Sequence, residues 1–362
     1  MLRALAASGD AAQRERAHAT LELSAQFRGE RAVVGPALAS IIAAADADRV
    51  AIYDARHGRD LPGRRTRARA DLAADEARDG ARKTYSFYKT IYRRNSVDDR
   101  GLTLDSTVHY GTHFDNAQWN GRQMIYGDGD GKLFERFTKS LDVIAHELTH
   151  GVTQYSAALA YAGESGALNE HFSDVFGSLV RQHALKQTAA KADWLLGAGL
   201  LTPRVNGVAV RSMKAPGTAY DDKLLGKDPQ PAHMRDFKRL HGDNGGVHVN
   251  SGIPNHAFYL AAIAIGGKAW EVAGRIWYAT LTTKLAPRAT FRDCARATLV
   301  AAAEMYGATS EPRRAVEQAW RSVGVDVAAI AQADPHLPVF EPAAEMPTLH
   351  PARPRRRVRH AD

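Results

Sequence analysis

Hydrophobic and polar residues are spaced differently in the two halves of the chain. In the first half, apolar residues form short runs or alternate with polar ones, which predicts strands at 50–54, 103–110 and 123–126. From residue 141 onward they recur every three or four positions, which predicts helices over residues 141–154, 167–183, 254–284, 290–306 and 311–322. Helical spacing also covers residues 1–27 and 76–95. The pattern therefore predicts an α+β fold whose strand-rich part precedes its helical part.

Length and composition add limits to this picture. The chain has 362 residues, enough for two substantial lobes with extensions, and its 44% hydrophobic and 24% charged residues are ordinary for a globular protein. No apolar run is long enough to predict a membrane span. The one cysteine, Cys294, excludes an intrachain disulfide and is expected in the core. We therefore expect the fold to depend on its core and on metal.

Part of the formal net charge of +8 comes from an arginine-rich run at residues 353–359. One interpretation is a segment that binds nucleic acid or an anionic surface, whose binding would be salt-sensitive and lost on truncation of residues 350–362. The interpretation we favour is a solvated, disordered tail over residues 341–362. No nucleic-acid partner and no membrane partner are expected.

The first candidate for chemistry lies in the predicted helix 141–154, where Ser140 is expected to be the N-cap. His146 and His150 are four residues apart, so their rings project from one helix face and can bind one zinc ion. Glu147 lies beside such a metal and can take a proton from a zinc-bound water. Because this motif is short and occurs by chance, an ion-paired surface helix remains an alternative at this point.

The next predicted helix supplies the missing ligand. Glu170 follows His150 by twenty residues, near the beginning of a helix that we expect to open at about Gly166. A third protein ligand leaves a position open for water, as a catalytic zinc site requires. Asp174, one turn further along the same face, can accept the second ring N–H of a ligand histidine. His171 and His183 are expected to be ordinary core or surface residues.

Several longer motifs in a fixed order then resemble one known family. Residues 116–121 resemble a substrate-binding edge strand, 142–150 a zinc helix, 164–174 a helix with the third zinc ligand, and 243–252 a segment with a second catalytic histidine. Over about residues 85–325 the chain resembles the thermolysin-like peptidases, the gluzincins. The resemblance implies two lobes, an N-terminal strand-rich lobe and a C-terminal helical lobe, with the active-site cleft and zinc helix between them.

The resemblance also implies roles for individual residues. It makes His146, His150 and Glu170 the ligands of one zinc ion and Glu147 the general base of peptide hydrolysis. His248 and Tyr161 would stabilise the oxyanion, with Asp243 supporting the charge of His248. Substrate-binding roles would fall to Asn116 and Ala117 for the peptide main chain, Arg211 for a backbone carbonyl, and an apolar pocket of Phe134, Phe137, Val143 and Val210. The pocket implies a preference for bulky apolar residues after the cleaved bond.

Some positions depart from the family pattern. The relatives commonly hold paired structural calcium in a carboxylate cluster, of which Asp142 and Asp193 remain here, while the other positions are Arg181, Leu195, Ala198 and Gly199. Because calcium needs six to eight oxygen ligands, we predict that the paired calcium site is absent. Gln118 replaces an aromatic residue in the edge-strand motif, and residues 139–140 replace a glycine pair found in some relatives.

The N-terminal extension resembles the abbreviated propeptide of the protealysin branch, over residues 2–21 with Ser8-Gly9-Asp10. We therefore expect a zymogen cleaved within residues 40–50, with a plain helical decoration as the alternative. The expected organisation is a propeptide at 1–47, a β-rich lobe at 48–155, a helical lobe at 156–340 and the tail. The apolar start is broken too early for a signal peptide, so either the protein is not exported by that route or the recorded start is displaced. Secretion by another route is expected, with a cytoplasmic location as the alternative.

Taken together, the sequence predicts a monomeric zinc endopeptidase that acts on proteins or peptides and is held inactive by its own propeptide. A catalytically silent zinc protein with the same scaffold is the second hypothesis. The presence of Glu147, Tyr161, Asp243 and His248 argues against that second hypothesis.

Overall fold

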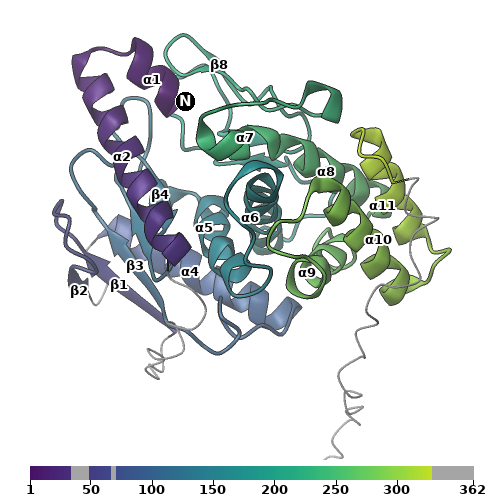
Figure 1. Cartoon of the computed structure of the whole chain (residues 1–362). Coiled ribbons are helices and arrows are strands. Elements are labelled where there is room, and N and C mark those ends of the chain that lie inside the picture. The colour runs from purple at the N-terminus through teal and green to yellow at the C-terminus, as the bar shows by residue number, and fades with distance from the viewer. Residues whose placement is uncertain (34–48, 67–70, 328–362) are drawn as a thin grey trace, which may run out of the picture. The chain divides into compact units, whose positions relative to one another are not determined.

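The computed structural model describes residues 1–33, 49–66 and 71–327 (Figure 1). Two N-terminal helices, α1 (Leu2–Ser8) and α2 (Ala11–Val33), precede a strand-rich region, and helices follow from residue 141 onward. The basic tail and most of the expected cleavage region lie outside the described residues. The predicted α+β architecture, a strand-rich part followed by a helical part, is confirmed.

The central element of the first part is a mixed five-stranded sheet with the strand order β2-β1-β3-β5-β4. The inner strands β1 (Val50–Asp54), β3 (Leu104–Val108) and β5 (Met124–Tyr126) are parallel neighbours. The edge strands β2 (Arg64–Thr66) and β4 (Ala117–Trp119) pair antiparallel with β1 and β5. The motif expected to be an edge strand, residues 116–121, therefore does contribute a strand to one edge of this sheet.

Helix α4 (Leu72–Ile91) packs against the sheet through β1 and β3. Its buried side includes Ala73, Ala77 and Phe87, spaced at helical intervals. Asp71 is its N-cap, and its carboxylate accepts a hydrogen bond of 2.8 Å from the backbone N–H of Ala74.

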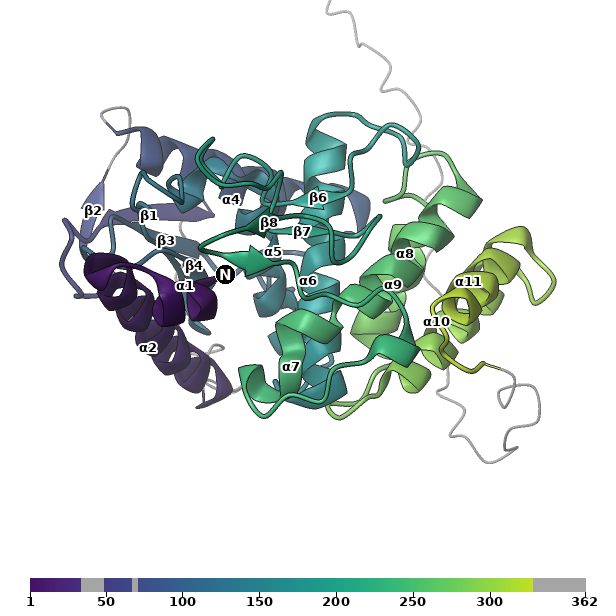
Figure 2. The same cartoon turned by 90° about the horizontal axis from the view of Figure 1, so that it is seen from above.

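Helices α5 (Leu141–Gln154) and α6 (Gly163–Ala184) pack against each other in the middle of the molecule, as Figures 1 and 2 both show. Residues 165–180 of α6 are all buried, so this stretch of the helix has no side that faces solvent. A Cβ added at Gly177 would lie 2.5 Å from the carbonyl oxygen of Asp142. Glycine at this position therefore permits the close approach of the two helices.

The helical part continues with α7 (Asp243–Asn250), α8 (Gly252–Ile265), α9 (Ala273–Thr283), α10 (Phe291–Tyr306) and α11 (Glu311–Ser322). Two short hairpins lie between α6 and α7: β6 (Leu195–Leu196) with β7 (Arg211–Ser212), and β8 (Asp221–Asp222) with β9 (Gly226–Lys227). Single 3₁₀ turns cover Phe137–Lys139 and Met234–Asp236. Cys294 is buried in α10, as expected.

His171 is a core residue of α6. The indole N–H of Trp277 donates to its Nε2 over 2.8 Å, and its Nδ1 lies 2.8 Å from the side-chain oxygen of Asn255. Burial lowers the pKa of His171 to about 4, so the ring is neutral with its proton on Nδ1. The ring is thus fully used in packing and hydrogen bonding, which agrees with the structural interpretation made from the sequence.

The sequence pattern was wrong in a few places. The predicted helix 254–284 is two helices, because the chain leaves α8 at Gly266 and Gly267, both with positive φ. Helix α6 begins at Gly163, before the expected Gly166. Ser140 is the N-cap residue of α5, but its hydroxyl does not cap the helix and instead donates to the carboxylate of Asp142.

Candidate functional site

Three buried side chains from α5 and α6 meet where the two helices cross. Nε2 of His146 lies 3.4 Å from Oε2 of Glu170, and Nε2 of His150 lies 3.4 Å from Oε1 of the same carboxylate. The helical spacing of four residues directs both imidazoles to one face of α5, towards α6. The sequence expectation that these three residues meet is confirmed.

The geometry of this group fits a zinc ion. Tetrahedral zinc with bonds of about 2.0–2.2 Å separates its ligand atoms by roughly 3.3–3.6 Å, which is the spacing found here. Oε2 of Glu170 is buried and has no hydrogen-bond partner. A buried carboxylate oxygen without a partner is costly unless a cation occupies the adjacent space. Two imidazoles and one carboxylate are also the donor set that zinc prefers at catalytic sites.

Both histidines are oriented by a hydrogen bond from their second ring nitrogen. Nδ1 of His146 lies 2.8 Å from Oδ1 of Asp174, the carboxylate expected to accept from a ligand histidine. Nδ1 of His150 lies 2.7 Å from the side-chain oxygen of Asn169, a partner that the sequence reasoning missed. Each bond fixes the ring tautomer so that Nε2 faces the metal position.

Asp174 is the centre of a buried polar network. Besides His146, it accepts hydrogen bonds from Nη2 of Arg211 over 2.9 Å and from Nδ2 of Asn255 over 2.8 Å. Although burial opposes ionisation, the guanidinium of Arg211 and the ring of His146 lower the pKa of Asp174 to about 2. The same carboxylate and that of Glu170 raise the pKa of His146 to about 10, despite its burial. A zinc ion at this site would replace that proton.

Glu147 points to the same space without joining the ligand set. Its Oε2 accepts a hydrogen bond of 3.0 Å from the backbone N–H of Trp119 in β4, and its Oε1 is 3.9 Å from Nε2 of His146. Burial raises the pKa of Glu147, which brings it closer to the range in which a carboxylate accepts and returns a proton.

Tyr161 and His248 also lie beside the carboxylate of Glu170. The hydroxyl of Tyr161 donates to Oε1 of Glu170 and lies 3.2 Å from Nε2 of His248. Nδ1 of His248 is 2.6 Å from Oδ1 of Asp243. Burial lowers the pKa of His248, but the charges of Glu170 and Asp243 outweigh burial and raise it. The raised pKa favours the protonated ring, which carries two N–H groups.

A tight left-handed turn brings Asp243 back onto His248. Four consecutive residues have positive φ: 57° at Asp243, 50° at Asn244, 89° at Gly245 and 83° at Gly246. Only glycine and, less readily, asparagine and aspartate adopt this region without strain. The Asp-Asn-Gly-Gly sequence is therefore required by the turn, which also lets the carboxylate of Asp243 accept from the backbone N–H of His248 over 3.0 Å.

These groups line one cavity of about 620 Å³. The cavity also contains all of the residues expected to bind substrate: Asn116, Ala117, Phe134, Phe137, Val143, Val210 and Arg211. Phe134 and Phe137 form an apolar wall, with their ring centroids 6.1 Å apart. Arg211 contacts Asp174 rather than the centre of the cavity, since both Nε and Nη2 bond to Oδ1 of that residue.

Helix α2 closes one side of the same cavity, and it lies alongside β4 in both views (Figures 1 and 2). The hydroxyl of Ser24 lies 3.0 Å from Nδ2 of Asn116, and the backbone oxygen of Ser24 accepts from Nε2 of Gln118 over 3.1 Å. The guanidinium of Arg31 lies over the ring of Tyr161, 4.4 Å from its centroid. These contacts of α2 with the site could not be read from the sequence pattern.

Comparison with protein families gives two matches that together cover most of the chain. Residues 40–154 match the model described as "Thermolysin metallopeptidase, catalytic domain". Residues 157–325 match the model described as "Thermolysin metallopeptidase, alpha-helical domain". The boundary between the two matches falls between α5 and α6, which together hold the three candidate metal ligands.

Individual proteins give the same result. The chain is 55% identical over 282 residues to the "Extracellular metalloprotease" of Pectobacterium carotovorum subsp. carotovorum, which covers 76% of this chain and 81% of that protein. It is 41% identical over 289 residues to the "Thermolysin" of Alicyclobacillus acidocaldarius subsp. acidocaldarius, covering 75% of this chain and 50% of the relative. The structure resembles that of the precursor of protealysin, a metalloproteinase from Serratia proteamaculans, with a TM-score of 0.81 and 48% identity. That match covers 90% of this chain and 97% of the other.

Proposed function

This chain belongs to the thermolysin family of zinc metalloendopeptidases, and we propose that it is a precursor whose mature form cleaves peptide bonds with Glu147 as general base. The observation that carries this proposal is the orientation of Glu147. Its carboxylate is buried beside the His146, His150 and Glu170 group, yet its own hydrogen bond goes to the backbone of β4. It is therefore available for proton transfer, next to the strand on which a peptide substrate would lie.

Zinc held by His146, His150 and Glu170 would act as a Lewis acid that lowers the pKa of a bound water and polarises the scissile carbonyl. The protein residues handle the protons. Glu147 accepts a proton from the attacking water and delivers it to the leaving amine. The raised pKa of Glu147 suits both proton transfers. It makes the protonated carboxyl a weaker acid, which can hold the proton until the leaving amine takes it.

His248 and Tyr161 stabilise the negative charge that develops on the carbonyl oxygen. Nε2 of His248 and the hydroxyl of Tyr161 are 3.2 Å apart, so both can donate to one oxygen placed between them and the metal ligands. The carboxylate of Asp243 accepts from Nδ1 of His248 and favours the doubly protonated ring, in which Nε2–H is also a donor. A silent zinc-binding scaffold would have no need for this arrangement.

After removal of α2, the substrate main chain is proposed to pair with β4, an edge strand of the sheet, at Asn116 and Ala117. Arg211, fixed by Asp174, is proposed to reach a substrate carbonyl. The side chain after the cleaved bond would enter the apolar pocket formed by Phe134, Phe137, Val143 and Val210. Cleavage is therefore expected before leucine, isoleucine, valine and phenylalanine.

Filling this pocket tests both the reaction and the specificity. Val210→Phe is expected to lower kcat/KM at least about tenfold for peptides with leucine or phenylalanine after the bond, as a loss of apolar pocket contacts does. Val208→Phe is the matched control, because Val208 is 62% exposed two residues away and should leave kcat/KM unchanged. Cleavage sites in denatured casein, identified by mass spectrometry, measure the preference. An unselective pattern, or equal effects of the two variants, would contradict the proposed pocket.

The N-terminal helices are proposed to act as the propeptide, with residues 1–47 removed on activation. The position of α2 over β4 and Tyr161 supports this, as does the similarity to a precursor of protealysin. The mature enzyme would then consist of the lobes proposed at 48–155 and 156–340, acting as a monomer on protein or peptide substrates. The tail at 341–362 has no proposed role in hydrolysis.

We also propose that the paired calcium site is lost. Both carboxylate oxygens of Asp193 accept from the guanidinium of Arg181, over 2.7 and 2.8 Å. Asp142 accepts from Ser140 and from the backbone N–H of Gly197 over 3.2 Å, so its oxygens are also in use. A cation at Arg181 opposes a divalent ion beside it. Adding millimolar calcium should therefore shift Tm by less than about 2 °C, and a larger rise would contradict this proposal.

Secretion is proposed from the relative that is named an extracellular metalloprotease. In the described part of the chain, no helix combines the length and the apolar character needed to span a membrane. Immunodetection in the culture medium of the producing cells, with a cytoplasmic marker as the control for lysis, tests the location. Retention of the protein with that marker would contradict secretion.

A further inference from the structure

A second group of metal-binding side chains lies away from the zinc site, at the carboxyl ends of three parallel strands. His57 follows β1, His109 follows β3 directly, and Asp128 follows β5 by two residues. Because parallel strands end at the same side of a sheet, these three residues meet although they are far apart in sequence. None of them lines the cavity that contains Glu147. We call this group the strand-end cluster.

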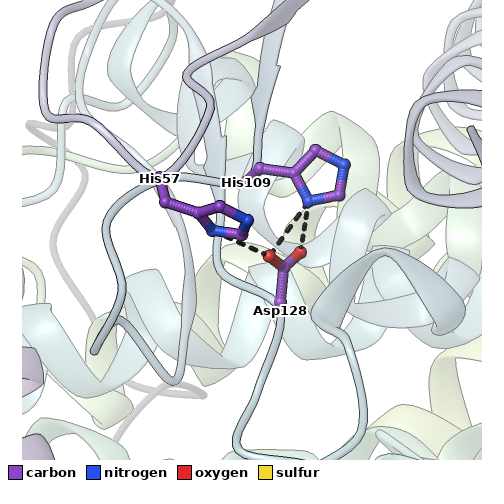
Figure 3. A group of neighbouring side chains, drawn as sticks. All are labelled: His57, His109 and Asp128. Carbon is purple, nitrogen blue, oxygen red and sulfur yellow. Dashed lines mark hydrogen bonds and ion pairs between the residues drawn. The ribbon is translucent and has the colours of Figure 1, made fainter.

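The ligand atoms of the strand-end cluster lie within 4.8 Å of one another. The carboxylate of Asp128 lies between the two imidazoles, as Figure 3 shows. Nδ1 of His57 is 3.5 Å from Oδ2 of Asp128, and Nδ1 of His109 is 2.8 Å from Oδ1. The first separation is that of two ligands on one zinc ion, and the second is a hydrogen bond that a metal ion would replace.

The backbone already holds the two histidines beside each other. The N–H of His57 donates to the carbonyl of His109 over 2.8 Å, and the N–H of Gly111 donates to the carbonyl of Gly58 over 2.9 Å. These bonds extend the pairing of β1 with β3 beyond the strands. The centroids of the two rings are consequently 5.6 Å apart. Little chain entropy would be lost on binding an ion here.

Asp71 supplies the outer contact that a metal-bound histidine requires. Its Oδ2 lies 3.0 Å from Nε2 of His109, on the side of the ring opposite Asp128. A carboxylate at this nitrogen fixes the tautomer in which Nδ1 faces the metal, as Asp174 does for His146. Asp71 is itself fixed as the N-cap of α4, so the ring of His109 is held from both sides.

We propose that His57, His109 and Asp128 form a second zinc-binding site, completed by water. Two imidazoles and a carboxylate match zinc and exclude calcium, which requires an all-oxygen shell of six or more ligands. The side chain of His57 is 56% exposed and that of Asp128 is 32% exposed, so water can reach the fourth position. The bound ion would join the loops after β1, β3 and β5.

The competing interpretation is an ion pair that needs no metal, with His109 held between Asp128 and Asp71. Hydrogen bonds to these two carboxylates raise the pKa of His109 to about 9, and its partial burial opposes this only in part. Zinc must therefore displace a proton from Nδ1 of His109. The ion pair does not require His57, whereas the zinc site does. Substitution of His57 thus separates the two interpretations.

The experiment is a zinc titration of the metal-stripped full chain at pH 8, followed with a competing chromophoric chelator. His57 has a φ of +62°, a region that asparagine tolerates, so His57→Asn removes the ligand with little backbone strain. His57→Asn is expected to bind one zinc ion fewer than the wild type. His18→Asn, at an exposed position of α2, is the control and should bind the wild-type number. Asp71→Asn keeps an N-cap and should weaken the second site about tenfold.

Equal zinc stoichiometry in the wild type and His57→Asn would overturn the proposal, as would uptake of a single zinc ion by the wild type. Peptide hydrolysis after activation provides an independent readout. It should remain at the wild-type rate in His57→Asn, because the strand-end cluster shares no residue with the catalytic site. A loss of hydrolysis in His57→Asn would mean that the missing ion was the catalytic one, and this result too would overturn the second site.

Discussion

Replacing Glu147 with glutamine is expected to reduce kcat about 10³-fold, the typical contribution of a positioned general base. Glutamine has the same shape and can still accept the hydrogen bond of 3.0 Å from the N–H of Trp119. It cannot take up a proton from water. The ligands His146, His150 and Glu170 are unchanged, so the variant should contain as much zinc as the wild type.

The comparison requires the mature form of the wild type and of each variant. It is prepared by cleavage with an unrelated protease at a recognition site introduced within residues 34–48. Glu317→Gln is the matched control, because Glu317 forms ion pairs with Arg313 and Arg321 on α11 and does not line the cavity. It should retain full activity. Hydrolysis by Glu147→Gln at the rate of this control, with zinc bound, would remove Glu147 from the mechanism.

Uncut full-length protein is expected to hydrolyse peptides at less than about 1% of the rate of the mature enzyme. Helix α2 covers the edge strand that the substrate needs, since Asn116 and Gln118 both contact Ser24. It is held there by the core of Leu23 and Phe27 against Tyr110, Phe114 and Ile125. If α2 covers the substrate-binding strand in nearly all molecules, only the small fraction of molecules in which α2 has moved away is active.

Phe27→Ala tests this directly. Phe27 is 1% exposed and makes edge-to-face contacts with the rings of Tyr110 and Phe114. Its truncation removes about 3 kcal/mol of packing, which should raise the activity of the uncut chain about 10- to 100-fold. Glu22→Ala, at an exposed position on the same helix, is the control and should leave the uncut chain inactive. Full activity of the uncut wild type would contradict the zymogen proposal.

The sequence predicted best the features that depend on local pattern. The bounds of α5 were predicted to the residue, because its apolar spacing is regular and polar residues flank it. The metal ligands followed from helix geometry and from the motif that resembles the family. By contrast, β2 is formed by Arg64, Arg65 and Thr66, which have no apolar alternation, and it depends on pairing with β1. The glycine pair at 266–267 was not recognised as a helix end.

Contacts between distant segments could not be predicted from one sequence. Asn169 forms a hydrogen bond with His150 across the packing of α5 against α6. Nothing in the sequence distinguishes this asparagine from a solvated one. The docking of α2 joins residues about ninety positions apart, such as Ser24 and Asn116. The strand-end cluster likewise becomes visible only when the parallel order of β1, β3 and β5 is known.

The zinc dependence of catalysis is measured as hydrolysis by the mature chain after its metal has been removed and zinc is returned stepwise. We expect no hydrolysis without metal, and complete recovery when the site of His146, His150 and Glu170 holds one zinc ion. A second equivalent bound at the strand-end cluster should add no activity. Continued hydrolysis by the metal-free chain would contradict a zinc-dependent mechanism at this site. Failure of zinc to restore hydrolysis in a folded chain would contradict it too.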